Sequence, residues 1–335
     1  MRVKRFLIKL LSSVWFGVDG VRKLLHLFFL LAIFSFFLGS LSITPPLLPK
    51  KAALFIQPIG PLVEQLNGDP YDRALAGVFD EVQPQTLVQD VIDALEFAKN
   101  DHRILAVHLE LSGFSGGGLD KLRRVGLAIE DFKKSGKPVF ASGDFFSQSA
   151  YYLAAHANEI YMHPEGMVYL KGYGGYKTYF KEAIDKLLID WNVFRVGTHK
   201  SFIESYTRMD MSPQDRESRI RLINQFWQIY QNDVEMARRV DIGLIDNFTQ
   251  NLLMYVDDAN GDIAVAALDA GLIDKLLSRN ELISQLKEYV GEDINDKAMY
   301  SAINSLDYLR SMRVSETEES NEKNIAIIMA VGNIL

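Results

Sequence analysis

The chain has 335 residues, of which 48% are hydrophobic and 24% charged, a composition that excludes wholesale disorder. The net charge is −7, yet residues 1–51 carry eight lysines and arginines against one acid, so the rest of the chain is strongly acidic. An acidic body argues against nucleic acid as a partner. The absence of cysteine excludes disulfides, thiolate metal sites and a cysteine nucleophile.

The N-terminal segment predicts a membrane anchor. Residues 24–43 carry no formal charge and are long enough to cross the hydrocarbon core as a transmembrane helix. Residues 1–23 are basic, and the positive-inside rule puts such a segment in the cytoplasm and the rest of the chain on the far side. The alternative is a cleaved signal peptide, although both the basic region and the apolar run are longer than is usual for one.

After residue 51 the chain alternates short apolar runs with helical patterns. Strands are expected at Ala52–Pro58, Arg103–Leu109, Pro138–Ser142, Glu159–Met162 and Asn192–Val196. Helices are expected at Thr86–Asn100, Leu119–Lys134, Ser149–His156, Tyr179–Leu188 and Pro213–Arg239. This alternation predicts an α/β fold with a parallel sheet covered by helices.

The end of the sequence contains a possible internal repeat. Residues 311–323 are charged and lack an apolar stripe, which predicts a linker. Residues 324–335 then read NIAIIMAVGNIL, similar to AALFIQPIGPLV at 52–63, and both segments follow a lysine and turn at a glycine. They are either the truncated start of a second copy of the unit at 51–310 or two buried strands that happen to look alike.

Two groups of residues could carry chemistry. The glycine loop Gly113–Gly118 either directs backbone N–H groups at an anion, such as the oxyanion of acyl transfer, or simply makes a tight strand-to-helix turn. Ser147 and Ser149 stand near a helix start, where serine is commonly a cap.

The six histidines lack paired spacing, which gives no support to a metal site or a Ser-His-Asp triad. The sequence predicts no cofactor. His108 alternates within a strand and is expected in the core or beside a backbone carbonyl.

Lys200 follows the expected strand Asn192–Val196 and a glycine turn. A lysine drawn into a dry pocket there would favour its neutral form and could serve as a general base. The alternative is a solvated surface lysine, which is the common state of this residue.

The segment FRVGTHKSFIESYTRMDMSPQDRES at 194–218 resembles the signal peptide peptidase A (protease IV) family of serine-lysine peptidases, which have a ClpP/crotonase-like fold. The matching positions are Arg195, Gly197, Lys200, Ser201, Glu204, Arg208, Asp210, Met211, Ser212 and Pro213. Residues 135–166 and 267–276 extend the resemblance, which covers essentially the whole chain and points to the N-terminal repeat of the long, two-repeat form.

The resemblance implies specific roles. In the long form the N-terminal repeat carries the lysine base, which the match assigns to Lys200, and the C-terminal repeat carries the serine nucleophile. Gln148 stands where this repeat would hold a nucleophile, and glutamine cannot attack a carbonyl. The chain by itself is therefore expected to be inactive, as a fragment or as a half that borrows a serine from another chain.

The resemblance also implies a setting and partners. The expected function is a serine-type endopeptidase half that degrades cleaved signal peptides, anchored in the bacterial inner (cytoplasmic) membrane with its soluble domain in the periplasm. The expected partners are signal peptides or other peptide substrates, the membrane and further copies in a homo-oligomer. The alternative function is a non-catalytic, membrane-anchored scaffold or binding protein.

Overall fold

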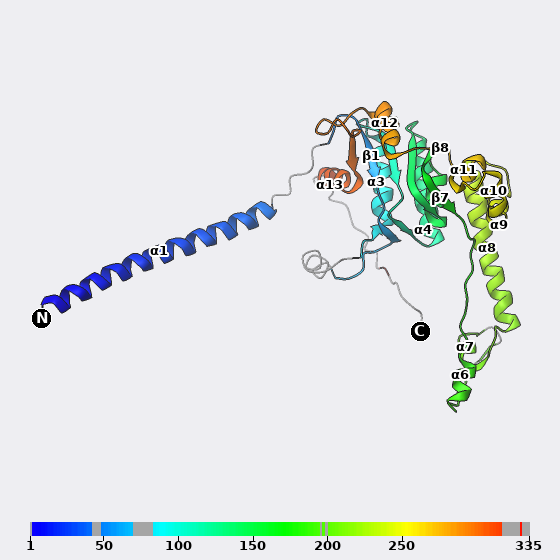
Figure 1. The fold of residues 1–335 in the computed structure, drawn as a ribbon, viewed down its shortest axis with the longest axis horizontal. Helices are drawn as coiled ribbons and strands as arrows, with labels where there is room; N and C mark the ends of the chain where they lie inside the picture. Colours follow the sequence, from blue (N-terminus) through cyan, green and yellow to red (C-terminus); the bar gives the residue numbers. More distant parts are fainter. Residues whose placement is uncertain are drawn as a thin grey trace. The chain divides into compact units, whose positions relative to one another are not determined.

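The computed structural model describes residues 2–41, 48–69, 83–194, 196–197, 200–316 and 329. The chain divides into two units, Met1–Pro46 and Leu47–Leu335. In the first unit, residues Arg2–Leu41 form one helix, α1 (Figure 1). No helix within the described ranges is long and apolar enough to cross a membrane.

The transmembrane helix expected at 24–43 is therefore not supported. The side chains of α1 are described only for residues 15–36. Residues 42 and 43 lie outside the described part of the chain.

The second unit is built on a six-stranded sheet in the order β8-β7-β6-β4-β1-β9, in which every neighbouring pair is parallel. A small second sheet has the order β3-β2-β5 and is also parallel. The strands are β1 Ala52–Ile56, β2 Gly60–Val63, β3 Thr86–Leu87, β4 Ile104–Glu110, β5 Phe114–Gly116, β6 Val139–Ser147, β7 Glu159–Tyr169, β8 Lys275–Leu276 and β9 Ala302–Asn304. The predicted α/β class and parallel sheet are confirmed.

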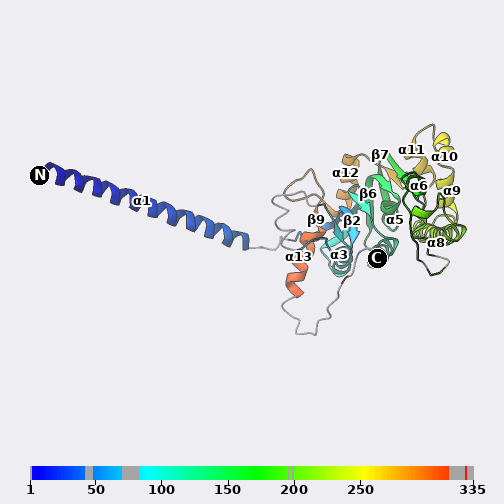
Figure 2. The ribbon, with the colours of Figure 1, turned by 90° about the horizontal axis from the view of Figure 1, so that it is seen from below.

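Helices cover both faces of the large sheet and build a helical extension beyond it (Figures 1 and 2). They are α3 Val88–Asn100, α4 Leu119–Lys133, α5 Gln148–Ala155, α6 Lys181–Lys186, α7 Glu204–Thr207, α8 Pro213–Arg238, α9 Leu244–Gln250, α10 Leu252–Asp258, α11 Ile263–Asp269, α12 Arg279–Val290 and α13 Ser305–Glu316.

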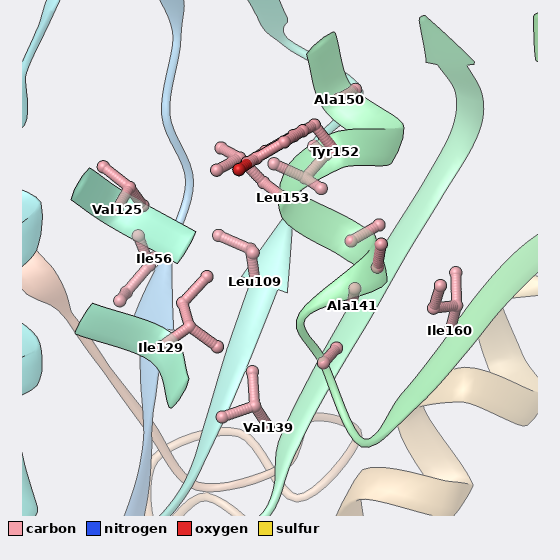
Figure 3. Packing of buried hydrophobic residues seen from close by; sticks show 14 of the residues in the cluster. Ile56, Leu109, Val125, Ile129, Val139, Ala141, Ala150, Tyr152, Leu153 and Ile160 are labelled. Atoms are coloured by element: carbon pink, nitrogen blue, oxygen red, sulfur yellow. The ribbon is translucent and has the colours of Figure 1, made fainter. Parts of the chain in front are cut away.

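The two faces of the sheet pack into two separate cores, because successive strand residues point to opposite sides. On β4, Val107 and Leu109 join the large core with α3, α4 and α5, whereas Ala106 joins a smaller core under α12. Figure 3 shows Ile129 of α4 and Leu153 of α5 directed at Leu109 in the large core. A sheet covered on both faces reads as near-continuous apolar sequence, as these strands do.

The predicted linker at 311–323 is wrong over its first part, because α13 continues to Glu316. Met312 packs against the large core, and Arg313 pairs with Asp90 and Asp93 of α3 at 2.7 and 2.6 Å. Tyr308 and Leu309 of α13 are buried in the large core just before this stretch, so the helix continues into 311–316 with only the half-buried Met312 and two ion pairs to hold its last turns. The proposed second repeat at 324–335 lies outside the described residues, except for Met329.

Candidate functional site

The lysine proposed as a base lies in a segment that leaves the sheet. We call residues 172–212 the arm; it contains α6 and α7, which lie at the end of α8 away from the sheet (Figure 1). Lys200 lies between α6 and α7, and its side chain is exposed in this chain. Its role as a general base remains a prediction.

The strand expected at Asn192–Val196 does not form among its described residues, 192–194 and 196. Its apolar side chains point outward instead of into a core, and Phe194 is 97% exposed. Short apolar runs do not reveal by themselves whether a neighbouring strand exists to pair with them.

The residues around Lys200 are held by a compact polar network. The Ser201 hydroxyl donates to Oδ1 of Asp215 at 2.7 Å. Arg219 Nε and Lys177 Nζ donate to Oδ2 of the same carboxylate at 3.0 and 3.4 Å. Asp215 is buried, so the bond from Ser201 ties the residue after Lys200 to the first turn of α8.

Burial by itself raises the pKa of Asp215, but the Ser201 hydrogen bond and the charges of Arg219 and Lys177 outweigh it and lower the pKa. The carboxylate is therefore ionised at neutral pH, and as an acceptor of charge-assisted hydrogen bonds it is a strong anchor.

A second set of contacts fixes the start of α8. The Ser212 hydroxyl accepts from the Asp215 N–H at 3.2 Å, and Pro213 stands at the first helical position, where its missing N–H costs nothing. The buried Glu204 of α7 accepts from the Ser212 N–H at 3.1 Å. Four positions of the matched motif thus serve one local structure.

The position expected to hold a nucleophile is occupied by a structural glutamine. Gln148 begins α5 directly after β6, with Ser147 as the N-cap. Its side-chain oxygen accepts from the Lys171 N–H at 3.2 Å, and its carbonyl accepts from the Tyr230 hydroxyl at 2.9 Å. Ser147 is a cap, as the sequence suggested, and its hydroxyl accepts from the Ala150 N–H.

The glycine loop lies beside this helix start. Residues Phe114–Gly116 form β5 and pair with β2. The sequence predicted neither of these two strands. Gly116 has a φ of 118°, and a Cβ there would lie 3.1 Å from the Ser149 Oγ. The loop makes a tight strand-to-helix turn and brings the backbone of Gly116 close to the start of α5, while Lys200 belongs to the arm (Figure 1).

Sequence reasoning missed a buried polar chain on the α12 side of the sheet. His108 of β4 lies with Nε2 2.7 Å from the Ser142 Oγ and Nδ1 2.6 Å from the Tyr300 hydroxyl. The core position expected for His108 is correct, but its partners are hydroxyls and not a backbone carbonyl. Burial lowers the pKa of His108 to about 3, so the ring is neutral. No cluster suited to a metal ion occurs among the described residues.

Comparison with known proteins identifies the domain. Residues 131–293 match the model of peptidase family S49. The chain carries an S49 peptidase domain. The match includes the Gln148 helix start, the arm with Lys200 and the Ser201–Asp215 network. The resemblance seen in the sequence is confirmed.

Curated relatives agree with the S49 match. The chain is 36% identical to Protease 4 of Salmonella typhi over 277 residues, which cover 83% of this chain and 42% of that protein. It is 32% identical to Protease 4 of Haemophilus influenzae over 339 residues, which cover 100% of this chain and 54% of that protein. The chain spans about half the length of the curated relatives that it matches.

Among solved structures, the chain is similar to a membrane-bound stomatin-specific protease in complex with a substrate peptide. The match has a TM-score of 0.38 and 14% identity, and covers 79% of this chain and 99% of that one. That TM-score is too low to define the fold.

Proposed function

We propose that this chain is the base-supplying half of a serine-lysine endopeptidase, with Lys200 as the general base. The observation that carries the proposal is the network in which Ser201, Glu204, Ser212 and Asp215 bind one another next to Lys200. An anchor of buried, hydrogen-bonded groups is the kind of support that a positioned catalytic side chain needs.

The chemistry follows from a neutral lysine. Its amine takes the proton of a serine hydroxyl, and the serine oxygen attacks the peptide carbonyl carbon. Backbone N–H groups stabilise the oxyanion, and the protonated lysine then gives its proton to the leaving amine. Water hydrolyses the resulting ester with the same lysine as base.

We propose that the nucleophile comes from outside the segments that the structure describes. Gln148 has no hydroxyl, and Ser147 and Ser201 are engaged as a helix cap and as a donor to Asp215. We propose that a serine in the remaining part of a longer protein, as in the two-repeat form, completes the dyad.

The surface of the arm supports a covering partner. Leu188, Phe194 and Phe202 are each more than 85% exposed, an unusual state for large apolar side chains gathered in one segment. A second repeat or a second copy of the chain in a homo-oligomer would bury them and also exclude water from Lys200, which favours the neutral amine.

Substrate and location belong to the same proposal. We propose signal peptides, which are apolar, as substrates on the strength of the family resemblance. The same resemblance is our reason for proposing a ClpP/crotonase-like fold. We also propose a place at the bacterial inner membrane with the globular unit in the periplasm. The basic residues of α1 and its exposed apolar side chains, such as Trp15 and Phe28, support attachment to a membrane surface.

A serine-directed acylating probe tests the proposal. Residues 1–335 alone should show no labelling and no peptide hydrolysis above background. A longer protein that adds the C-terminal half of the relatives should be labelled at one serine in that added half. Labelling at Ser147, Ser149 or Ser201 in the chain alone would show that the nucleophile has been assigned wrongly.

One observation favours a second candidate function, a non-catalytic scaffold or binding protein. Gln148 is integrated into the start of α5 through two hydrogen bonds, so the position expected to hold a nucleophile supports the fold instead. A longer protein that remains unlabelled and inactive, yet still binds apolar peptides, would support the scaffold.

A further inference from the structure

A cavity of about 540 Å³ lies on the α12 side of the large sheet. Its floor comes from β1, β4, β6 and β7, and its roof from α12 and the segment that leads to β9. Neither Lys200 nor any other described residue of the arm lines it. Its size is typical of pockets that enclose a small organic ligand.

The polar part of the floor is the chain Ser142–His108–Tyr300. Ser142 and His108 are each 4% exposed and Tyr300 is 7% exposed. Both nitrogens of the His108 ring form hydrogen bonds, Nε2 with the Ser142 hydroxyl at 2.7 Å and Nδ1 with the Tyr300 hydroxyl at 2.6 Å. All three residues line the cavity.

A count of hydrogens shows that this chain has a donor to spare. The neutral imidazole carries one N–H, and each of the two hydroxyls carries one O–H, so the chain has one more donor than it has hydrogen bonds. If Nδ1 is protonated, the Tyr300 hydrogen is left over; if Nε2 is protonated, the Ser142 hydrogen is left over. In both tautomers one hydroxyl hydrogen has no acceptor among the residues that the structure describes.

The charge state supports the same conclusion. Burial lowers the pKa of His108 to about 3 and raises that of Tyr300, so the floor is uncharged at neutral pH. A buried donor without an acceptor is costly, and a ligand oxygen would relieve that cost.

The walls and rim restrict the ligand further. Phe55, Leu282, Ile283 and Met299 make the walls apolar. At the rim, the Glu110 carboxylate accepts from Gln57 and the Ser112 N–H. Asp144 adds a second carboxylate, and Arg279 is the one arginine among the described residues of the lining, so the balance of these charges disfavours anions.

We propose that this cavity binds a small, uncharged apolar compound through a carbonyl oxygen that accepts the spare hydroxyl hydrogen of the Ser142–His108–Tyr300 chain. The proposal does not depend on peptidase activity, and the test below measures binding only.

The test uses two probes of nearly the same shape, benzophenone, which has a carbonyl, and diphenylmethane, which lacks it. Isothermal titration calorimetry on residues 1–335 should show binding of both, with benzophenone about three- to ten-fold tighter, as one hydrogen bond provides. The triple variant Ser142→Ala, His108→Leu, Tyr300→Phe removes every donor of the chain. It should keep diphenylmethane binding and bind the two probes equally.

A second variant covers the case in which the triple variant fails to fold. Ile283→Trp fills the cavity from α12 and should abolish binding of both probes, whereas Leu253→Trp, on the exposed surface of α10, should leave both unchanged. The proposal is overturned if the wild type binds neither probe or does not prefer benzophenone. Retention of that preference by the triple variant, or of binding by Ile283→Trp, also overturns it.

Discussion

The sheet and the arm make opposite use of apolar residues. In the sheet, Leu54 of β1 is fully buried between β4 and β9 and packs into the large core. In the arm, Phe194 and Phe202 are almost fully exposed. The sheet buries its apolar residues among the elements that the structure describes, whereas the arm leaves apolar side chains exposed. The candidate catalytic lysine belongs to this exposed region, and we therefore propose that its activity depends on a partner.

Two substitutions to alanine, one in the sheet and one in the arm, test this difference most strongly. Leu54→Ala should lower the free energy of unfolding by about 2–5 kcal/mol, because it leaves a cavity in the core. Phe202→Ala should change it by less than about 0.5 kcal/mol, because little area is lost from burial. Urea denaturation of the two variants measures both; a large loss in Phe202→Ala would mean that the arm is already covered in this chain.

Acidification should destabilise the sheet through His108. Its pKa is 6.5 in the unfolded chain and about 3 when folded, so the unfolded state binds the proton first as the pH falls below 6.5. Stability is fully present above pH 6.5 and is lost towards pH 3, by about 2 kcal/mol between pH 7 and pH 5.

His108→Gln should remove that dependence, as read from denaturation midpoints at the two pH values. Asp101 offers a contrast. Burial raises its pKa, but hydrogen bonds from Arg103 and Tyr308 outweigh this and hold it at about 2, so its contribution is lost only below pH 3.8. An unchanged slope in His108→Gln would show that another group titrates between pH 5 and 7.

The arm should respond locally to the loss of its anchor. Asp215→Asn keeps the shape of the side chain but removes the charge that holds Ser201, Arg219 and Lys177. The free energy of local opening of the arm should fall by about 1 kcal/mol, while the free energy of global unfolding stays the same. Amide hydrogen exchange over the described residues of 200–212 should be about five-fold faster while the melting temperature stays constant. The control Asp185→Asn, which breaks an exposed ion pair with Lys181, should leave exchange in 200–212 unchanged. A fall in melting temperature in Asp215→Asn would assign this network to the core.

The sequence predicted the sheet better than the site, for physical reasons. The apolar runs of β1 and β4 and the stripe Leu122, Val125, Ile129 of α4 report burial directly, so their elements formed as expected. The short strands β8 and β9 were missed because two or three residues carry no periodicity. The run at 192–196 was misread because its apolar character serves an exposed surface.

The polar contacts were hidden by distance along the chain. Tyr300 stands 192 residues from His108, and no local pattern joins them. By contrast, the resemblance matched Ser201, and its partner Asp215 lies only 14 residues further on in the same segment, 194–218, although it was not among the matched positions.

The most direct test of the account concerns Lys200 in a protein that joins this chain to the C-terminal half of its relatives. Lys200→Arg keeps a positive charge but cannot act as a base at neutral pH, because guanidinium holds its proton. Cleavage of an apolar peptide should fall at least about 10³-fold, within the range for loss of a general base, while Lys186→Arg on α6 of the same arm keeps full activity. A Lys200→Arg enzyme that still cleaves the peptide would contradict the account and place the base elsewhere.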